Sequence, residues 1–151
     1  AMTHCDASKL AKQHGKKAEY ALCAAQWHKS LSYKDKYFGN GMKYDKDFNA
    51  EYGYTPPYQA AESSAALLVW KDAFERANST DTEKVRDALA KTDMQTFYGN
   101  IKFGSGGQNT AKPMVLFQVI CDGDKCENKV VAPTKWASAK LVHPVPKWSE
   151  R

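Results

Sequence analysis

Residues 57–77 constrain the fold of this chain most, because they have the apolar spacing of a long helix. Pro57 suits a first helical turn, and Asn78 suits the position just past a helix end. Apolar side chains, Leu68 and Phe74 among them, recur on one face, which is predicted to point into the core. The alanines on that face allow a neighbouring element to approach closely. The segment therefore predicts a helix packed against another layer.

Shorter elements surround this helix. Helices are predicted at residues 6–14, at 43–52, and from Thr80, where Glu83 completes a capping-box pattern. Strands are predicted at 18–27, 98–103, 114–121 and 129–132, and the last two are joined by a turn at 122–125. This order indicates an α/β fold with a βαβ-like first part and an antiparallel hairpin near its end.

Four cysteines stand at positions 5, 23, 121 and 126. Four cysteines allow two disulfides in three connectivities. Cys121 and Cys126 flank a turn, so opposed positions across a hairpin can bring them within bonding distance. A disulfide at this turn would indicate an oxidising compartment, because disulfides are rare in the cytosol.

Charge and composition exclude several classes of protein. The net charge is +5, but only three of the 22 basic residues are Arg, and acidic residues alternate with the lysines. This pattern predicts a solvated surface and no nucleic-acid partner. The apolar runs are too short to span a membrane. Residues 1–4 lack the pattern of a secretory signal peptide, as expected for a mature or excised chain.

The sequence predicts neither a metal site nor a catalytic centre. His4, Cys5 and Asp6 are adjacent, and adjacent side chains rarely converge on one metal ion. No Gly-x-Ser-x-Gly motif is present, and the glycines at 104–107 lack the Lys-Ser/Thr ending of a phosphate-binding loop. We therefore expect no cofactor and no enzymatic activity.

Five phrases carry a resemblance to a known family. They are YGYTPPYQAAE (52–62), DAFERANS (72–79), EKVRDAL (83–89), TFYGNIKF (96–103) and VLFQV (115–119). Their order and spacing resemble the periplasmic solute-binding proteins of ABC transporters, of the branched-chain amino-acid (leucine/isoleucine/valine) type. Residues 1–22 are similar to the strand-end, helix and strand of that family.

The resemblance implies part of a type I periplasmic-binding-protein fold. In that fold, helices pack on a mainly parallel sheet, and an antiparallel hairpin lies near the C-terminus. Residues 1–151 are expected to form a single compact unit that corresponds to the C-terminal part of a two-lobed protein. In this family the chain crosses between lobes several times, and a small ligand binds in the cleft between them.

The resemblance also implies ligand-binding residues. The first turn of the 57–77 helix approaches the ligand in the family, so Tyr58, Gln59 and Glu62 are candidate contacts. The family places an acidic residue near the ligand's ammonium group at the corner that corresponds to residues 1–6. Here that corner reads His4-Cys5-Asp6, with Cys5 where the acid is expected. This departure leaves open a solute without an ammonium group.

Trp27, at the end of its predicted strand, is a further candidate at the rim of the site. By this resemblance the chain is an extracytoplasmic, periplasmic component of an ABC importer. Its partners would be a small solute and a membrane permease. The family's N-terminal half has no match here, so exposed surface is expected to pair two copies as a homodimer. A small Cys/His-dependent enzyme and a stand-alone interaction module are the alternatives.

Overall fold

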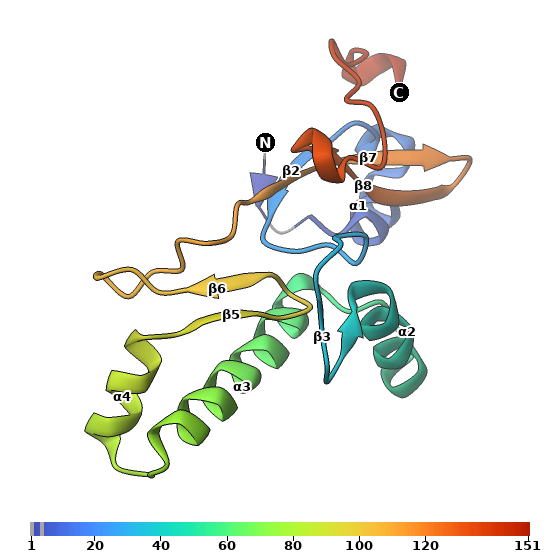
Figure 1. Cartoon of the computed structure of the whole chain (residues 1–151). Coiled ribbons are helices and arrows are strands. Elements are labelled where there is room, and N and C mark those ends of the chain that lie inside the picture. The colour runs from blue at the N-terminus through green and yellow to red at the C-terminus, as the bar shows by residue number, and fades with distance from the viewer. Residues whose placement is uncertain (1, 4) are drawn as a thin grey trace. The chain divides into compact units, whose positions relative to one another are not determined.

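The computed structural model describes residues 2, 3 and 5–151, and the chain divides into two compact units (Figure 1). Unit 1 contains residues 1–28 and 114–151, and unit 2 contains residues 29–113. The expectation of a single compact unit, corresponding to the C-terminal part of a two-lobed protein, stays a prediction. Periodicity in a sequence predicts individual elements, but it does not tell which elements share a core.

A four-stranded sheet organises unit 1. Its strands are β1 (Met2–Thr3), β2 (Leu22–Ala25), β7 (Val115–Asp122) and β8 (Lys125–Ala132), in the order β1-β2-β7-β8. β1 and β2 pair in parallel, whereas β2–β7 and β7–β8 are antiparallel. The resemblance implies a mainly parallel sheet, but in the described part of the chain only the β1–β2 pair is parallel. The predicted βαβ beginning and the C-terminal hairpin are both present.

Helix α1 (Ala7–His14) forms the crossover between β1 and β2. Asp6 caps it, because Oδ1 accepts hydrogen bonds from the amides of Ser8 at 3.0 Å and Lys9 at 3.1 Å. The helix ends at Gly15, whose φ is +57°. A 3₁₀ turn (Gly15–Ala18) follows, and β2 therefore begins only at Leu22, later than predicted.

Two disulfides and one buried amide stabilise unit 1. Cys5 is bonded to Cys23 and Cys121 to Cys126, with Cα–Cα distances of 5.7 Å and 4.0 Å. Gln118 is fully buried on β7, where its amide bonds to both the N–H and the carbonyl of Val142. The irregular C-terminal segment is thereby attached to the sheet. It contains two 3₁₀ turns, Thr134–Trp136 and Trp148–Glu150.

Unit 2 consists of three helices and two short hairpins. The helices are α2 (Gly41–Tyr52), α3 (Tyr58–Ala77) and α4 (Thr82–Ala90), and the hairpins are β3 (Lys34–Asp35) with β4 (Gly39–Asn40) and β5 (Asp93–Gln95) with β6 (Asn100–Lys102). Asp81, not Thr80, caps α4, because its carboxylate accepts from the amide of Lys84 at 3.0 Å.

α3 and α4 lie side by side (Figure 1) and share an apolar contact of Ala73, Val85 and Ala88. Arg76 joins the two helices, because it donates to the carbonyl of Ala88 at 2.7 Å. Phe74 was predicted to face the core, but it is 41% exposed. Ala73 occupies the inward position instead. Among the described residues, the helices lack the length or the apolar character of a membrane-spanning segment.

Aromatic rings form a second core in unit 2. Phe97 is fully buried, with its ring stacked on Tyr44 at a centroid distance of 4.3 Å and near Phe38 at 5.0 Å. Asp35 positions this cluster, since its carboxylate accepts from the amides of Phe38 at 2.8 Å and Phe97 at 2.6 Å. The β3–β4 hairpin and the loop after β5 are thus fixed to each other.

Candidate functional site

The turn between β5 and β6 positions two buried side chains of unit 2, Thr96 and Tyr98. Thr96 is fully buried, and its backbone N–H and hydroxyl both donate to the carbonyl of Gly99 at 2.9 Å. The Gly99 amide returns a bond to the carbonyl of Thr96 at 3.1 Å. This tight turn places the ring of Tyr98, which is 6% exposed, between α3 and the segment that follows β6.

Gly99 allows a lysine to lie across this turn. The φ of Gly99 is +150°, and a Cβ there would stand 2.4 Å from Cδ and Cε of Lys112. Lys112 uses this space to place its Nζ 3.9 Å from the centroid of the Tyr98 ring, a cation–π contact. The Nζ atom is buried and has no hydrogen-bond acceptor among the described residues.

The electrostatics of this cluster follow from burial. Burial lowers the pKa of Lys112 to about 8, although the nearby carboxylate of Glu62 acts to raise it. Burial also raises the pKa of Tyr98, and the charges of Glu62 and Tyr58 add to the effect. Glu62 thus lies close enough to influence both Lys112 and Tyr98.

A cavity of about 330 Å³ opens beside the cluster, entirely within unit 2. Its lining is mainly apolar, and Glu62, Tyr98 and Asn109 supply the polar groups. The apolar lining comes from α3, α4 and the region of β6: Ala65, Ala66, Val69, Trp70, Leu89, Ile101 and Phe103. Asn109 bonds to the backbone of Lys102 and Asn100, so its amide is occupied in the fold. Glu62 is the carboxylate that borders the cavity.

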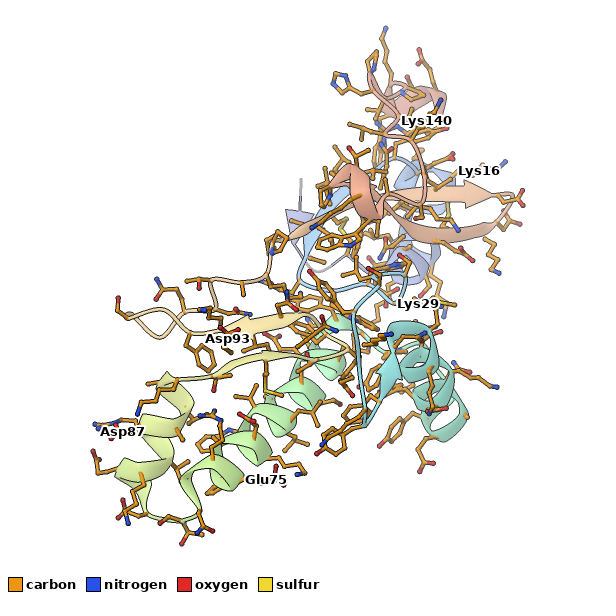
Figure 2. The ribbon with its side chains drawn as sticks, viewed as in Figure 1. Lys16, Lys29, Glu75, Asp87, Asp93 and Lys140 are labelled. Atoms are coloured by element: carbon orange, nitrogen blue, oxygen red, sulfur yellow. A yellow bond between two sulfur atoms is a disulfide. The ribbon has the colours of Figure 1, made fainter. Side chains whose placement is uncertain are left out.

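The structure places the three α3 candidates at the beginning of that helix. Tyr58 is half-buried, whereas Gln59 and Glu62 are exposed. Of the three, only Glu62 lines the cavity. In Figure 2 the labelled Glu75, further along α3, lies on the outer side of the helix, away from β5 and β6. It forms an ion pair there with Lys71. Glu62 thus borders the cavity, whereas Glu75 does not.

The remaining candidates lie in unit 1. His4 lies outside the described residues. Cys5 carries no free thiol, because its sulfur is bonded to Cys23. Burial would raise the pKa of Asp6, but hydrogen bonds from Ser8 and Lys9 outweigh it and lower that pKa, as expected for a helix cap. Trp27 is 4% exposed, and its place at the rim of a ligand site stays a prediction.

Tyr98 and Lys112 were not among the sequence-predicted residues. Tyr98 lies inside a phrase that was assigned only to a strand, and Lys112 is one of 22 basic residues in a chain of scattered charges. The available signal was Gly99, because a glycine within a predicted strand often marks a position where another group approaches the backbone closely. The sequence does not say which group approaches.

Residues 1–125 match the family model described as periplasmic binding protein. The chain belongs to the periplasmic binding protein family. This match covers β1 through β7 and ends at the first residue of β8, so it includes all of unit 2 and part of unit 1. The α/β arrangement with its C-terminal hairpin is accordingly part of the type I periplasmic-binding-protein fold.

Solved structures with the same fold include three amino-acid-binding proteins. The leucine binding protein LivK of Thermotoga maritima is 24% identical with a TM-score of 0.64, and the match covers 85% of this chain and 35% of LivK. LivJ of Streptococcus pneumoniae, in complex with isoleucine, is 15% identical with a TM-score of 0.59, covering 83% and 34%. A leucine-, isoleucine-, valine-, threonine- and alanine-binding protein of Brucella ovis is 14% identical with a TM-score of 0.62, covering 90% and 37%.

This periplasmic-binding-protein chain therefore spans about a third of the length of those three proteins. At these identities the likeness establishes the fold. It does not transfer a ligand or a binding residue to this chain.

Proposed function

We propose that this chain is part of the extracytoplasmic solute-binding component of an ABC importer, and that it binds an amino acid or a similar small organic solute. The family match over residues 1–125 carries the proposal. The fold shared with LivK and with isoleucine-bound LivJ supports it. So does the cavity of about 330 Å³ in unit 2, which combines apolar walls with the Glu62 carboxylate.

Two further features support this assignment. All four cysteines of the sequence form disulfides, which suits an oxidising, periplasmic or otherwise extracytoplasmic location. The proposed role is binding and delivery to a membrane permease, so no bond is made or broken. The alternative, a Cys-dependent enzyme, would need a free Cys5 thiol as its nucleophile. Cys5 has no free thiol, because its sulfur is bonded to Cys23.

We also propose that the isolated 151-residue chain forms a homodimer through α3. Leu67, Trp70 and Phe74 are 69%, 47% and 41% exposed, and their spacing places them along one side of that helix. A contiguous exposed apolar face of this kind favours association. Sedimentation of the chain as a compact monomer at micromolar concentration would contradict this proposal.

A thermal-shift screen tests the proposed function. The protein that carries these residues, expressed from its complete reading frame, is heated with amino acids, amino-acid amides and aromatic acids, each at millimolar concentration. A solute that binds only the folded protein raises Tm in proportion to the logarithm of its concentration. We expect at least one of these solutes to do so. If none of them raises Tm, the proposed function is wrong.

A further inference from the structure

Unit 1 carries a cluster of exposed lysines on α1 and on the 3₁₀ turn that follows it. Residues 7–18 contain four lysines and no acidic residue, whereas acidic residues alternate with lysines along much of the sequence. All four side chains are exposed: Lys9, Lys12, Lys16 and Lys17. Among the described residues, the one ion pair that this lysine cluster forms is that of Lys9 with Asp6, at 3.9 Å.

The acidic side chains around the lysine cluster do not cover it. Asp6 caps the opposite end of α1 from Lys16, and Glu19 accepts a hydrogen bond from the amide of Cys121 at 3.3 Å. Asp124 opposes the positive charge, since it borders the same small hollow as Lys16. A lysine stem is longer than that of an aspartate, so the ammonium groups extend further toward an approaching surface.

The C-terminal segment places an exposed tryptophan beside the lysine cluster. The guanidinium of Arg151 donates to the carbonyl of Glu19 at 2.9 Å, so this segment is held directly after the 3₁₀ turn. Trp148 is 54% exposed, and its ring centroid lies 6.4 Å from that of His14, the last residue of α1. Residues 128–149 contain four further lysines and no acidic residue. An exposed indole therefore adjoins a surface rich in ammonium groups.

We propose that this face of unit 1, formed by the lysine cluster and Trp148, binds a membrane surface that carries anionic lipid headgroups. The ammonium groups are attracted to the headgroup phosphates, and each lysine near such a surface strengthens binding by about fivefold. The indole of Trp148 enters the interface, where an apolar ring with one polar N–H is favoured. This inference goes beyond the proposed function and requires no solute.

The residue types favour a lipid surface over an acidic protein as the partner. Protein interfaces are enriched in Arg, whose planar guanidinium pairs with carboxylates in a fixed geometry, and they are depleted in Lys. The cluster contains only lysines, and ammonium groups on flexible stems suit headgroups that move in the plane of a membrane. Trp148 adds the residue type that is enriched where membranes meet water. It lies beyond residue 125, where the match to the family model ends.

Co-sedimentation with vesicles tests the inference on the protein expressed from its complete reading frame. The vesicles are phosphatidylcholine alone, or phosphatidylcholine with about 30% phosphatidylglycerol as the anionic lipid. A cluster variant replaces three lysines of unit 1: Lys12→Gln, Lys16→Gln and Lys17→Gln. A control variant has the same change in net charge and replaces three exposed lysines of unit 2: Lys46→Gln, Lys84→Gln and Lys91→Gln.

We expect wild type to bind the anionic vesicles and to leave the neutral ones in solution. The cluster variant should bind the anionic vesicles at least about tenfold more weakly, since it lacks three of the four ammonium groups. The control variant should match wild type. Raising the salt concentration from about 0.05 M to about 0.5 M should release the protein, because the Debye length becomes shorter than the reach of the attraction.

Trp148 is tested by fluorescence. Anionic vesicles with brominated acyl chains should quench the tryptophan emission of wild type, and Trp148→Phe should remove most of that quenching. Met42→Ala, which alters an exposed apolar side chain of α2, is the matched control and should be quenched like wild type. Equal quenching of wild type and Trp148→Phe would overturn the placement of Trp148 at the lipid surface.

Three other results would contradict the inference. Equal binding to neutral and anionic vesicles would remove the role of charge, and equal weakening by the cluster and control variants would show an effect of net charge alone. Binding to poly-L-glutamate that the cluster variant loses, without binding to anionic vesicles, would identify an acidic protein as the partner instead of a lipid. No solute enters this experiment, so its failure leaves the proposed solute binding to the thermal-shift screen.

Discussion

In unit 1, strands from both ends of the sequence form one sheet that two disulfides fasten, whereas unit 2 is a continuous stretch of helices and short hairpins around aromatic rings. Segments separated by about a hundred residues meet in unit 1 through the β2–β7 ladder and through Gln118, whose amide donates to the carbonyl of Tyr20. The two disulfides link cysteines only 18 and 5 residues apart. Unit 2 closes through local contacts. In unit 1, which has the disulfides, the described candidate residues form a disulfide, cap a helix or are buried. In unit 2, which has no disulfide, Glu62 is exposed and borders a cavity.

The largest expected effect tests the aromatic core of unit 2. Phe97→Ala removes a fully buried ring, so it should lower the free energy of unfolding by about 3–5 kcal/mol. Urea denaturation measures the loss, and hydrogen exchange locates it to residues 29–113. The control is Phe74→Ala, which removes an exposed ring and should cost below about 1 kcal/mol. Similar losses for both variants would contradict the packing described.

The next effect belongs to unit 1. Replacing Cys5 and Cys23 by Ser opens a link across 18 residues, which should cost about 3 kcal/mol of unfolding free energy. The same replacement of Cys121 and Cys126 opens a link across 5 residues and should cost about 2 kcal/mol. Hydrogen exchange should show the change in β2, β7 and β8. Faster exchange in α3 and α4 instead would show that the units are not stabilised separately.

The pH dependence of stability tests the buried Lys112. Its pKa is about 8 in the folded chain and about 10.4 in an unfolded one, so the unfolded chain binds the proton more tightly. Stability contributed by this group should therefore increase as pH rises from 7 to 9.5, by about 2 kcal/mol relative to Lys112→Met. Urea denaturation at the two pH values measures the difference. If the free energy of unfolding changed with pH in the same way for both proteins, the Lys112 ammonium would have to be exposed to water.

The smallest effect on stability is expected on the exposed side of α3. Leu67→Gln should change the unfolding free energy by no more than about 0.5 kcal/mol, because Leu67 is 69% exposed. It should nevertheless weaken self-association of the isolated chain, measured by sedimentation equilibrium. Unchanged association would remove α3 as the dimer contact.

Sequence reasoning predicted elements well where a local signal marks their ends. Asp6 and Gly15 bound α1, and Gly53 ends α2 with a φ of +76°, because a cap or a positive φ needs a particular residue type. The C-terminal hairpin followed from its turn and its two cysteines. Phe74 was misplaced because apolar character alone does not fix a helix face when Ala73 fills the inward position.

Glu62 was a candidate from the resemblance of α3, and its contact with a ligand stays a prediction. Tyr98 and Lys112 were not predicted, because they lie on a turn and a connecting segment that periodicity does not describe. The disulfide of Cys5 and the burial of Trp27 depend on how separate elements pack, which the local sequence pattern does not show. Whether either residue contacts a ligand stays a prediction.

Hydrogen exchange with and without L-leucine tests the proposed solute binding most directly, since it reports which segments of the chain a bound solute protects. We expect 10 mM L-leucine to slow amide exchange in the first turns of α3, in the turn at residues 96–99 and around Lys112. Unchanged exchange in these three segments at that concentration would contradict the account.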